Sequence, residues 1–401
     1  MYDILADISL VEVSSYVASP TAGLYLAQFG ADVIKVDQIG GGQDFRRWPV
    51  TENNDALGWE NLNRAKRSLT LDLTRPEGRE ILAELIGKVG NLLTNLPEAG
   101  FLAHDRIAER RADLITVRIM GWPDGAVALD FTANAAVGYP ALTGPLDDPR
   151  PVNHVLPAWD LLTGAYAAYA LLAAVRRRER TGLGGEVRLP LTDIAMGTAS
   201  NMGRIAEVLY TGEDRERLGN AVFGSIGRDF VTQDGVRMMI VAINERQWNG
   251  LVSALELAAK VSELEARLGI SFANDDGLRF THRVPIFELI EAEVGKRDHA
   301  DLIQLLGERG VVFGKYQTLL EAIEDPRLLA RNPLFSASSH NPSGFEYPAA
   351  GALATLPAMP RQPPAPAPRI GQHSEAILAD TLGLSSGEIG HLIAGGVVSV
   401  C

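Results

Sequence analysis

Cysteine is almost absent from this sequence. The only cysteine among the 401 residues is the last one, Cys401. A single thiol cannot form a disulfide within the chain or complete a cysteine-based zinc site, and a thiol at the chain end is not a buried nucleophile. The composition therefore excludes an internal disulfide, a zinc–cysteine centre and redox chemistry at sulfur.

Excess positive charge and long apolar runs are also missing. The formal net charge is −13, so we expect no extended basic surface for nucleic acid. No uninterrupted apolar stretch reaches the roughly 18–20 residues that a membrane span needs. The segment Met1–Asp7 has early acids and no basic region before an apolar block, unlike a signal peptide. We therefore expect a cytoplasmic protein without nucleic-acid or membrane partners.

Three common site motifs are not found either. The seven histidines show no HExxH or similar spacing, so no metal centre is expected. Ile39–Gly42 is rich in glycine but lacks the spacing of a dinucleotide or P-loop motif. Ser14, Ser15 and Ser225 lie outside any GxSxG elbow, which disfavours a serine hydrolase.

Apolar, β-branched segments alternate with helical segments over the first 120 residues. The chain length favours two domains. Ser19 and Pro20 suit the N-cap and first position of the first of these helices. Strands are expected at 8–13, 31–36, 68–73, 91–95 and 114–119, and helices at 22–29, 75–87 and 104–110. This alternation predicts an α/β fold with a Rossmann-like, mostly parallel sheet in a large domain.

A helix is expected over residues 160–180. It is apolar on nearly every face and rich in alanine and glycine, which predicts a buried, closely packed helix. A further strand is expected at 186–191. The composition then shifts near residue 205, where a hairpin over 231–243 and helices from 248 to 323 predict a smaller α+β domain.

The last part of the chain contains a stretch rich in proline and alanine, residues 357–368. This composition favours an extended arm on the surface. One helix at 374–382 and a short acidic turn are expected after it. The predicted domains are therefore 1–205 as the first part of the large domain, 206–325 as the small domain, and 326–401 as a return arm with the C-terminal part of the large domain.

Asp160 lies at the start of the alanine-rich helix. An aspartate in this place is commonly only an N-cap. The alternative is a carboxylate that apolar neighbours desolvate and that acts as a nucleophile. His154 is the nearest candidate for acid–base chemistry. Position alone leaves both interpretations of Asp160 open.

Two segments are candidates for holding an anion. The loop Ser14–Pro20 leads from a strand into a helix, where backbone N–H groups meet the helix dipole, although every such turn in an α/β protein looks similar. The segment Asn61–Arg67, with Arg46 and Arg47 upstream, is the densest cation cluster in an acidic protein. Its alternative is a solvated loop that only aids solubility.

Several segments, in the same order along the chain, resemble the class III CoA transferases, the family of formyl-CoA transferase and the α-methylacyl-CoA racemases. The resemblance covers essentially the whole chain. It rests on residues 26–36, 63–68, 94–97, 160–164, 180–182 and 247–248. It implies a large CoA-binding domain built from both ends of the chain, a small domain between them, and a homodimer of two interlocked rings.

The resemblance also implies an acyl-CoA thioester as substrate, CoA as part of that substrate, and no tightly bound cofactor. Asp160 matches the nucleophilic aspartate of the family. The CoA contacts of the family map onto Val17, Ala18, Leu71, Asp72, Leu73, Thr74, Asn95, Leu96, Pro97, Leu129 and Asp130. The chain departs from the family at Gln38, where many members have arginine, and at Val127, where formyl-CoA transferase has lysine. We therefore expect Arg46 or Arg47 to help bind the pyrophosphate.

Gly227–Phe230 resembles a branch of the family that moves CoA between the two carboxylates of one dicarboxylic acid. Arg228 is then a candidate for binding the free carboxylate, with an ion pair to a nearby acid such as Asp229 as the alternative. Ser19 and His154 are further candidates for substrate binding. An intermolecular CoA transferase and a non-catalytic CoA-ester binding protein remain alternatives. A racemase is disfavoured because Leu129 stands where racemases of the family carry histidine.

Overall fold

The chain divides into two compact units. The computed structural model describes residues 1–98, 100–338 and 340–401. The larger unit comprises Met1–Val137, His154–Gly212 and Leu329–Cys401, and the smaller unit comprises Gly138–Asn153 and Glu213–Leu328. The predicted boundaries at 205/206 and 325/326 lie a few residues from those of the units. Residues 138–153, expected in the large domain, cluster instead with the smaller unit.

The larger unit contains a seven-stranded sheet in the order β12-β3-β2-β1-β4-β5-β6. All neighbouring pairs are parallel except β12 with β3. The strands are β1 (Ser9–Val13), β2 (Asp32–Asp37), β3 (Arg67–Leu71), β4 (Asn91–Thr94), β5 (Ile115–Met120), β6 (Gly185–Pro190) and β12 (Val398–Ser399). The order β3-β2-β1-β4-β5-β6 is that of a Rossmann-like sheet, and the predicted α/β class with a parallel central sheet is confirmed.

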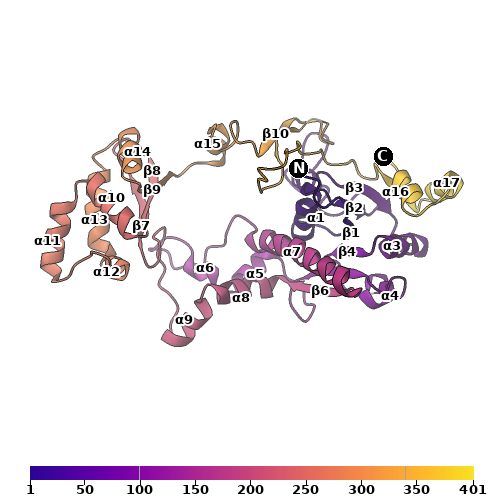
Figure 1. The fold of residues 1–401 in the computed structure, drawn as a ribbon, viewed down its shortest axis with the longest axis horizontal. Helices are drawn as coiled ribbons and strands as arrows, with labels where there is room; N and C mark the ends of the chain where they lie inside the picture. Colours follow the sequence, from indigo (N-terminus) through magenta and orange to yellow (C-terminus); the bar gives the residue numbers. More distant parts are fainter. Residues whose placement is uncertain (99, 339) are drawn as a thin grey trace. The chain divides into compact units, whose positions relative to one another are not determined.

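Helices cover both faces of this sheet (Figure 1). On one face, Val11 and Val13 of β1 join an apolar cluster with α3 (Pro76–Val89), α16 (Ser374–Asp380) and α17 (Ser386–Ala394). α1 (Ala18–Gln28) and α7 (Ala158–Thr181) pack on the other face. The remaining elements of the larger unit are α2 (Leu57–Leu62), α4 (His104–Ala108), α5 (Asp130–Ala136), α8 (Leu191–Asn201), α9 (Arg204–Thr211), the 3₁₀ turn Gly100–Leu102, and the hairpin β10 (Phe335–Ser338) and β11 (Tyr347–Ala350).

The contact between α1 and α7 is close because Gly164 faces α1. A Cβ atom on Gly164 would lie 2.6 Å from the carbonyl oxygen of Ala18 and 2.8 Å from Cβ of Thr21. α7 ends at Gly182, whose φ of 72° is readily adopted only by glycine. In the described part of the chain, α7 is the one helix long and apolar enough to cross a membrane. Core helices pass the same test, and the absence of a membrane span stays a prediction.

Two local predictions are wrong. α1 begins at Ala18 with Val17 as its N-cap, so Ser19 is not the cap but a buried residue of the first turn. The chain does not finish in a short acidic turn after α16. It forms α17, whose N-cap Ser385 exchanges hydrogen bonds with Glu388, and then β12, which joins the sheet at β3.

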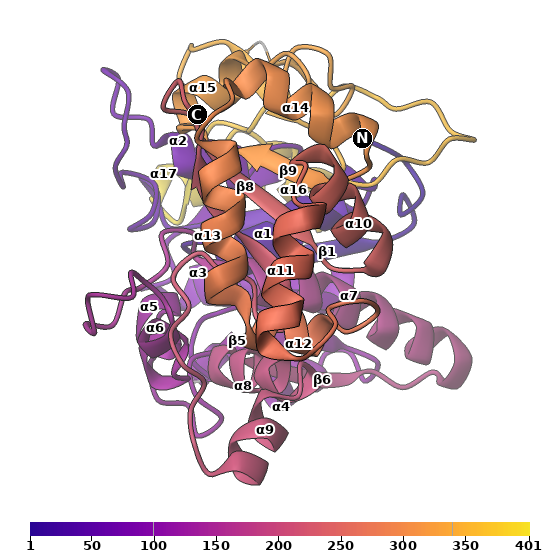
Figure 2. The same cartoon turned by 90° about the vertical axis from the view of Figure 1, so that its left-hand side faces the viewer.

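The smaller unit has an antiparallel sheet of β7 (Ile226–Val231), β8 (Arg237–Ala242) and β9 (Val312–Lys315). Figure 2 shows helices packed in front of these strands. Their apolar side chains form one core with the strands. The helices of the unit are α6 (Tyr139–Leu142), α10 (Glu245–Ala254), α11 (Ala258–Leu268), α12 (Asp276–Thr281), α13 (Arg283–Val294), α14 (His299–Glu308) and α15 (Leu319–Glu324).

Candidate active site

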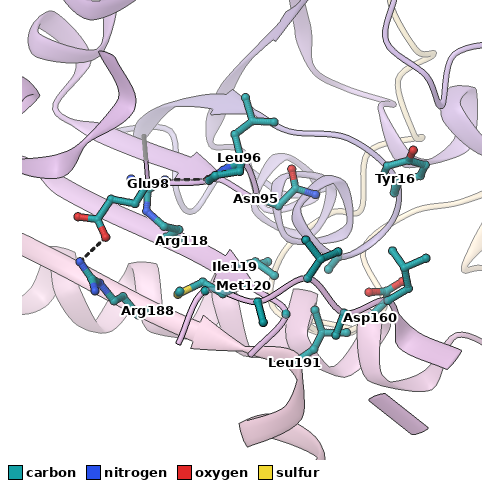
Figure 3. A pocket seen from close by; sticks show the side chains of 18 of the residues that line it. Tyr16, Asn95, Leu96, Glu98, Arg118, Ile119, Met120, Asp160, Arg188 and Leu191 are labelled. Atoms are coloured by element: carbon teal, nitrogen blue, oxygen red, sulfur yellow. Dashed lines mark hydrogen bonds and ion pairs between the residues drawn. The ribbon is translucent and has the colours of Figure 1, made fainter. Parts of the chain in front are cut away.

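A pocket of about 500 Å³ lies at the carboxyl ends of β1, β4 and β5, and Asp160 lines it (Figure 3). Strand order reverses between β1 and β4, and open α/β sheets bind ligands at such a point. The loops that follow these strands build the walls. The lining includes Ser15–Ala18 after β1, Asn95–Glu98 after β4, Gly121 and Pro123–Leu129 after β5, and Leu191 after β6.

Asp160 is the third residue of α7 and is partly buried. Burial and, to a smaller extent, the charge of Asp130 raise the pKa of Asp160, the charge of Arg47 lowers it, and the resulting pKa is about 6. A carboxyl group with this pKa is mostly ionised at pH 7 yet poorly solvated. The Asp160 side chain does not cap its helix, because the N-cap position is held by Pro157. The geometry therefore favours the nucleophile over the N-cap.

Asp130 caps α7 from a neighbouring helix. Its Oδ2 accepts hydrogen bonds from the backbone N–H groups of Trp159 (2.7 Å) and Asp160 (3.1 Å). Its Oδ1 lies 2.5 Å from Nε2 of His154. Asp130 is 2% exposed and is not part of the pocket lining. The structure therefore places Asp130 and His154, predicted to bind CoA and substrate, behind Asp160 and outside the pocket lining.

The loop after β1 presents unpaired backbone donors. The side chain of Asn95 joins it to the loop after β4, accepting from Ser15 N–H (3.1 Å) and donating to Ser15 O (2.8 Å). Within the described residues, no group accepts a hydrogen bond from the backbone N–H of Val17 or Ala18, and both residues line the pocket. Such N–H groups at a helix start attract anions.

The pocket thus brings together a subset of the predicted residues: Val17, Ala18, Asn95, Leu96, Pro97, Leu129 and Asp160. Ser19 does not line it, because its side chain is fully buried. Leu71–Thr74 does not line it either. That segment lies at the end of β3, where Leu71 pairs with Val398 and Asp72 N–H donates to Val397 O.

The arginines and the lysine that were candidates for holding an anion lie in different environments. Arg47 is exposed, and its guanidinium lies 5.6 Å from the ring centre of Tyr16, a pocket residue. Arg46 is exposed and outside the pocket lining. Lys66 is fully buried and lies 2.8 Å from Oε2 of Glu12. Arg64 is also buried, donating to Asn61 Oδ1 (2.6 Å) and Ala350 O (3.1 Å). The cation cluster at 61–67 therefore serves the fold and is not a solvated loop.

Arg228 belongs to the smaller unit, on β7. Its guanidinium carbon lies 4.8 Å from the ring centre of Phe230 and 4.9 Å from that of Phe287, and Nη2 lies 2.9 Å from the carboxylate of Glu291. Arg228 therefore forms the ion pair with a nearby acid that was the alternative to substrate binding, but its partner is Glu291 and not Asp229, which pairs with Arg237. The contact with Glu291 uses one guanidinium nitrogen, Nη2, while Nε donates to the carbonyl oxygen of Asp229 at 3.3 Å.

Two arginines of the pocket were not predicted. Arg118, 1% exposed, donates to Leu96 O (2.9 Å), Leu102 O (2.7 Å) and Glu186 (2.8 Å), so it holds the loop after β4. Arg188, on the adjacent strand, pairs with Glu98 (2.6 Å) at the pocket, as Figure 3 shows. Arg118 is the one charged residue of β5, and this charge inside a buried strand was the available signal. Among the described residues, no group of three or more metal-ligating side chains is found.

Comparison with known proteins identifies the family. The sequence profile of CoA-transferase family III matches residues 5–374. A 2-methylfumaryl-CoA isomerase of Chloroflexus aurantiacus is 42% identical over 405 residues, covering 100% of this chain and 98% of the relative. This chain belongs to CoA-transferase family III.

Other relatives agree with this assignment. A succinyl-CoA–D-citramalate CoA-transferase of Chloroflexus aurantiacus is 29% identical and covers 98% of both chains. The crystal structure of a CAIB/BAIF family protein from Brucella suis matches with a TM-score of 0.78 at 25% identity, over 95% of this chain and 100% of that chain. The protein is therefore an enzyme of the class III CoA transferases, as its motifs predicted.

Proposed function

We propose that the enzyme moves CoA between the two carboxylates of 2-methylfumarate (mesaconate), converting the C1 thioester into the C4 thioester within one molecule. The observation that carries this proposal is a partly buried Asp160 in the pocket of a chain 42% identical, over its full length, to a 2-methylfumaryl-CoA isomerase. A carboxylate that is ionised but desolvated suits covalent catalysis.

In the first half of the cycle, an Asp160 oxygen attacks the thioester carbonyl at C1. The carbon–sulfur bond breaks, CoA leaves as thiolate, and a mixed anhydride forms. The thiolate then attacks the aspartyl carbonyl, which releases the C1 carboxylate and leaves an aspartyl-CoA thioester. Val17 and Ala18 N–H are the candidates for stabilising the oxyanions, a contribution of about 3 kcal/mol per donor in other enzymes.

In the second half, the retained dicarboxylate attacks the aspartyl thioester through its C4 carboxylate and expels the thiolate. The thiolate attacks the C4 carbonyl of the new anhydride, which yields the C4 thioester and regenerates the Asp160 carboxylate. One thioester is broken and one is made, so the cycle needs no net proton transfer and no ATP. The CoA ester is the substrate, and no tightly bound cofactor is part of the proposal.

An intermolecular CoA transferase is the second candidate, because the match to the citramalate CoA-transferase also extends over 98% of this chain. The two differ in whether the free acid leaves between the half-reactions. We expect the enzyme to convert the C1 thioester of 2-methylfumaryl-CoA into the C4 isomer in the presence of excess ¹³C-labelled 2-methylfumarate without incorporating label. Label at the level of the free pool would replace the isomerase with a transferase.

Arg228 is proposed to retain the free carboxylate. Since Glu291 occupies its guanidinium, we expect Arg228→Ala to let ¹³C label enter the product, and Glu291→Gln to reduce the background of label entry. The two variants remove opposite partners of one ion pair and therefore control for each other. Equal label in folded Arg228→Ala and wild type would move the carboxylate site elsewhere.

A further inference from the structure

Tyr16 has an unusual backbone conformation in the pocket wall. Its φ is 68°, in the left-handed region that residues other than glycine rarely adopt. Such a conformation costs on the order of 1 kcal/mol or more and persists only where surrounding contacts impose it. Tyr16 immediately precedes Val17 and Ala18, whose N–H groups are unpaired. What holds Tyr16 therefore controls where those donors lie.

Segment 43–47, which follows β2, holds Tyr16 at three points. Oδ2 of Asp44 accepts a hydrogen bond from Tyr16 N–H at 2.9 Å, and Asp44 is only 5% exposed. Oε1 of Gln43 accepts from the Tyr16 hydroxyl at 2.6 Å. The guanidinium of Arg47 lies over the ring. Backbone, hydroxyl and ring are thus each contacted by one short segment.

Ser14, at the start of the loop, is held by buried charged side chains of β1 and β2. Lys35, fully buried, donates to the carbonyl oxygen of Ser14 and lies 3.2 Å from Asp37 and 3.9 Å from Glu12. The hydroxyl of Ser14 donates to Glu12 at 2.8 Å. Burying this many charges is expensive, and replacing them with apolar groups is often neutral or stabilising. Fold stability alone is therefore a weak reason for the cluster.

The cluster of Glu12, Lys35 and Asp37 also contacts the first turns of α1 through Lys66. Lys66 joins Glu12 and donates to the carbonyl oxygen of Pro20 at 3.0 Å. A Cβ atom on Gly23 would lie 1.9 Å from Glu12 Oε2, so α1 packs directly against the ion pair of Glu12 and Lys66. Three consecutive residues, Ser14 to Tyr16, and the helix after Val17 are all fixed, while the donors of Val17 and Ala18 are left open to the pocket.

We infer that Asp44 and Lys35 are positioning residues: they hold the loop Ser14–Tyr16 so that the N–H groups of Val17 and Ala18 stay open to the pocket beside Asp160. The inference rests on the proposed function, because these donors matter only if charge develops on an acyl oxygen there. Asp44 is the better residue to test, since it lies outside the sheet and its removal leaves the core side chains intact.

Asp44→Ala should lower kcat for 2-methylfumaryl-CoA by about 10- to 100-fold, the range expected when oxyanion donors are misplaced. KM should stay within about threefold, because the donors act on the transition state. Asp44→Asn keeps an oxygen that can accept from Tyr16 N–H and should retain most of kcat. Glu52→Ala, an acid-to-alanine change at an exposed site of the neighbouring segment, is the matched control and should behave as wild type.

The decisive measurement is the same substitution in a Tyr16→Gly background. Glycine adopts positive φ at no steric cost, so a loop with Gly at position 16 no longer needs Asp44. We expect Asp44→Ala to cost less than about threefold in that background, a non-additivity that a general loss of stability would not produce. An equal cost in both backgrounds, or wild-type kcat in a folded Asp44→Ala variant, overturns the inference.

Two further measurements test the inference if the Asp44 variant does not fold or if the proposed substrate is not converted. If Asp44→Ala does not fold, Gln43→Ala, at an exposed position, should lower kcat in the wild type and have no effect in Tyr16→Phe, which lacks the hydroxyl; an equal effect in both counts against the inference. If the wild type does not isomerise 2-methylfumaryl-CoA, the proposed function fails by itself. The rate of acyl-CoA-dependent mass gain at Asp160, followed by mass spectrometry, then tests the positioning separately.

Discussion

Asp160 combines partial burial with a neighbouring negative charge, and this sets a pH limit on the nucleophilic role that we propose for it. Its pKa of about 6 means that the attacking carboxylate is lost by protonation as the pH falls through this value. We expect kcat/KM to be flat above pH 7 and to fall about tenfold per pH unit below about 5. His154→Gln changes a partner of Asp130 without touching the carboxylate of Asp160 and is the control. A profile that stays flat down to pH 4.5 contradicts the assignment.

The same burial predicts that the ionised form of Asp160, which is the form needed for activity, lowers the stability of the folded protein. Since the folded-state pKa is raised, the folded protein binds this proton more tightly than the unfolded chain. The ionised carboxylate therefore destabilises the fold above about pH 6, by at most about 3 kcal/mol and by less because solvent screens the partly exposed group.

Asp160→Asn should abolish turnover and raise Tm at pH 8, and this difference in Tm should shrink toward zero as the pH falls to 4. Asp160→Ala should also be inactive while folding normally. Chemical denaturation at the two pH values and a turnover assay check both statements. A folded variant that keeps more than about a tenth of wild-type kcat removes Asp160 as the nucleophile.

At the scale of the elements, the contact of α1 with α7 links the helix that carries the backbone donors to the helix that carries Asp160, the proposed nucleophile. Gly164→Ala would place a methyl group 2.6 Å from the carbonyl oxygen of Ala18. We expect a loss of about 1–3 kcal/mol in the free energy of unfolding, although alanine favours the helix by about 1 kcal/mol. Gly197→Ala in α8 is the matched control, since nothing lies within 4 Å of its added Cβ. It should be neutral or stabilising, and equal effects of the two changes would contradict this packing.

The sequence was sufficient to predict elements whose pattern is local. It was insufficient where a contact with a distant segment determines the environment of a residue. The alternation of apolar strands and helices predicted the parallel sheet, and the alanine-rich stretch predicted α7. The N-cap of α1 was misplaced by two residues, because the observed cap, Val17, makes no side-chain capping bond and Ser19 is buried in the interior. Lys66 looked like a ligand-binding cation, since nothing in its neighbourhood shows that Glu12, on another strand, neutralises it.

The site shows the same division. Asp160, Asn95 and the Val17–Ala18 turn could be placed from motifs. The cap that Asp130 provides for α7, and the bonds that Arg118 makes to the loop after β4, depend on contacts between segments 22 to 30 residues apart. The sequence alone does not distinguish an aspartate that binds a ligand from one, such as Asp130, that caps a helix of another segment.

At the scale of the whole molecule, the chain leaves the larger unit after Gly212 and re-enters it at Leu329. We propose a homodimer of interlocked rings on this basis and on family resemblance, with a cytoplasmic location as a further expectation. Light scattering coupled to size exclusion should give twice 43.2 kDa. The dimer should resist dilution to nanomolar concentration, because linked chains separate only after unfolding. A monomer at any concentration at which the protein stays folded would contradict the interlocked form.

The two-residue strand β12 has one more consequence. By pairing antiparallel with Leu71 and Thr70, it covers the C-terminal end of the β3 edge, whereas Ser68 nearer the start of the strand is bonded to His373. Open edges of apolar strands recruit strands from other molecules. Deleting residues 396–401 should therefore turn β3 into a template for self-association, and the truncated protein should form thioflavin-positive aggregates on mild heating before it loses its helical circular dichroism signal.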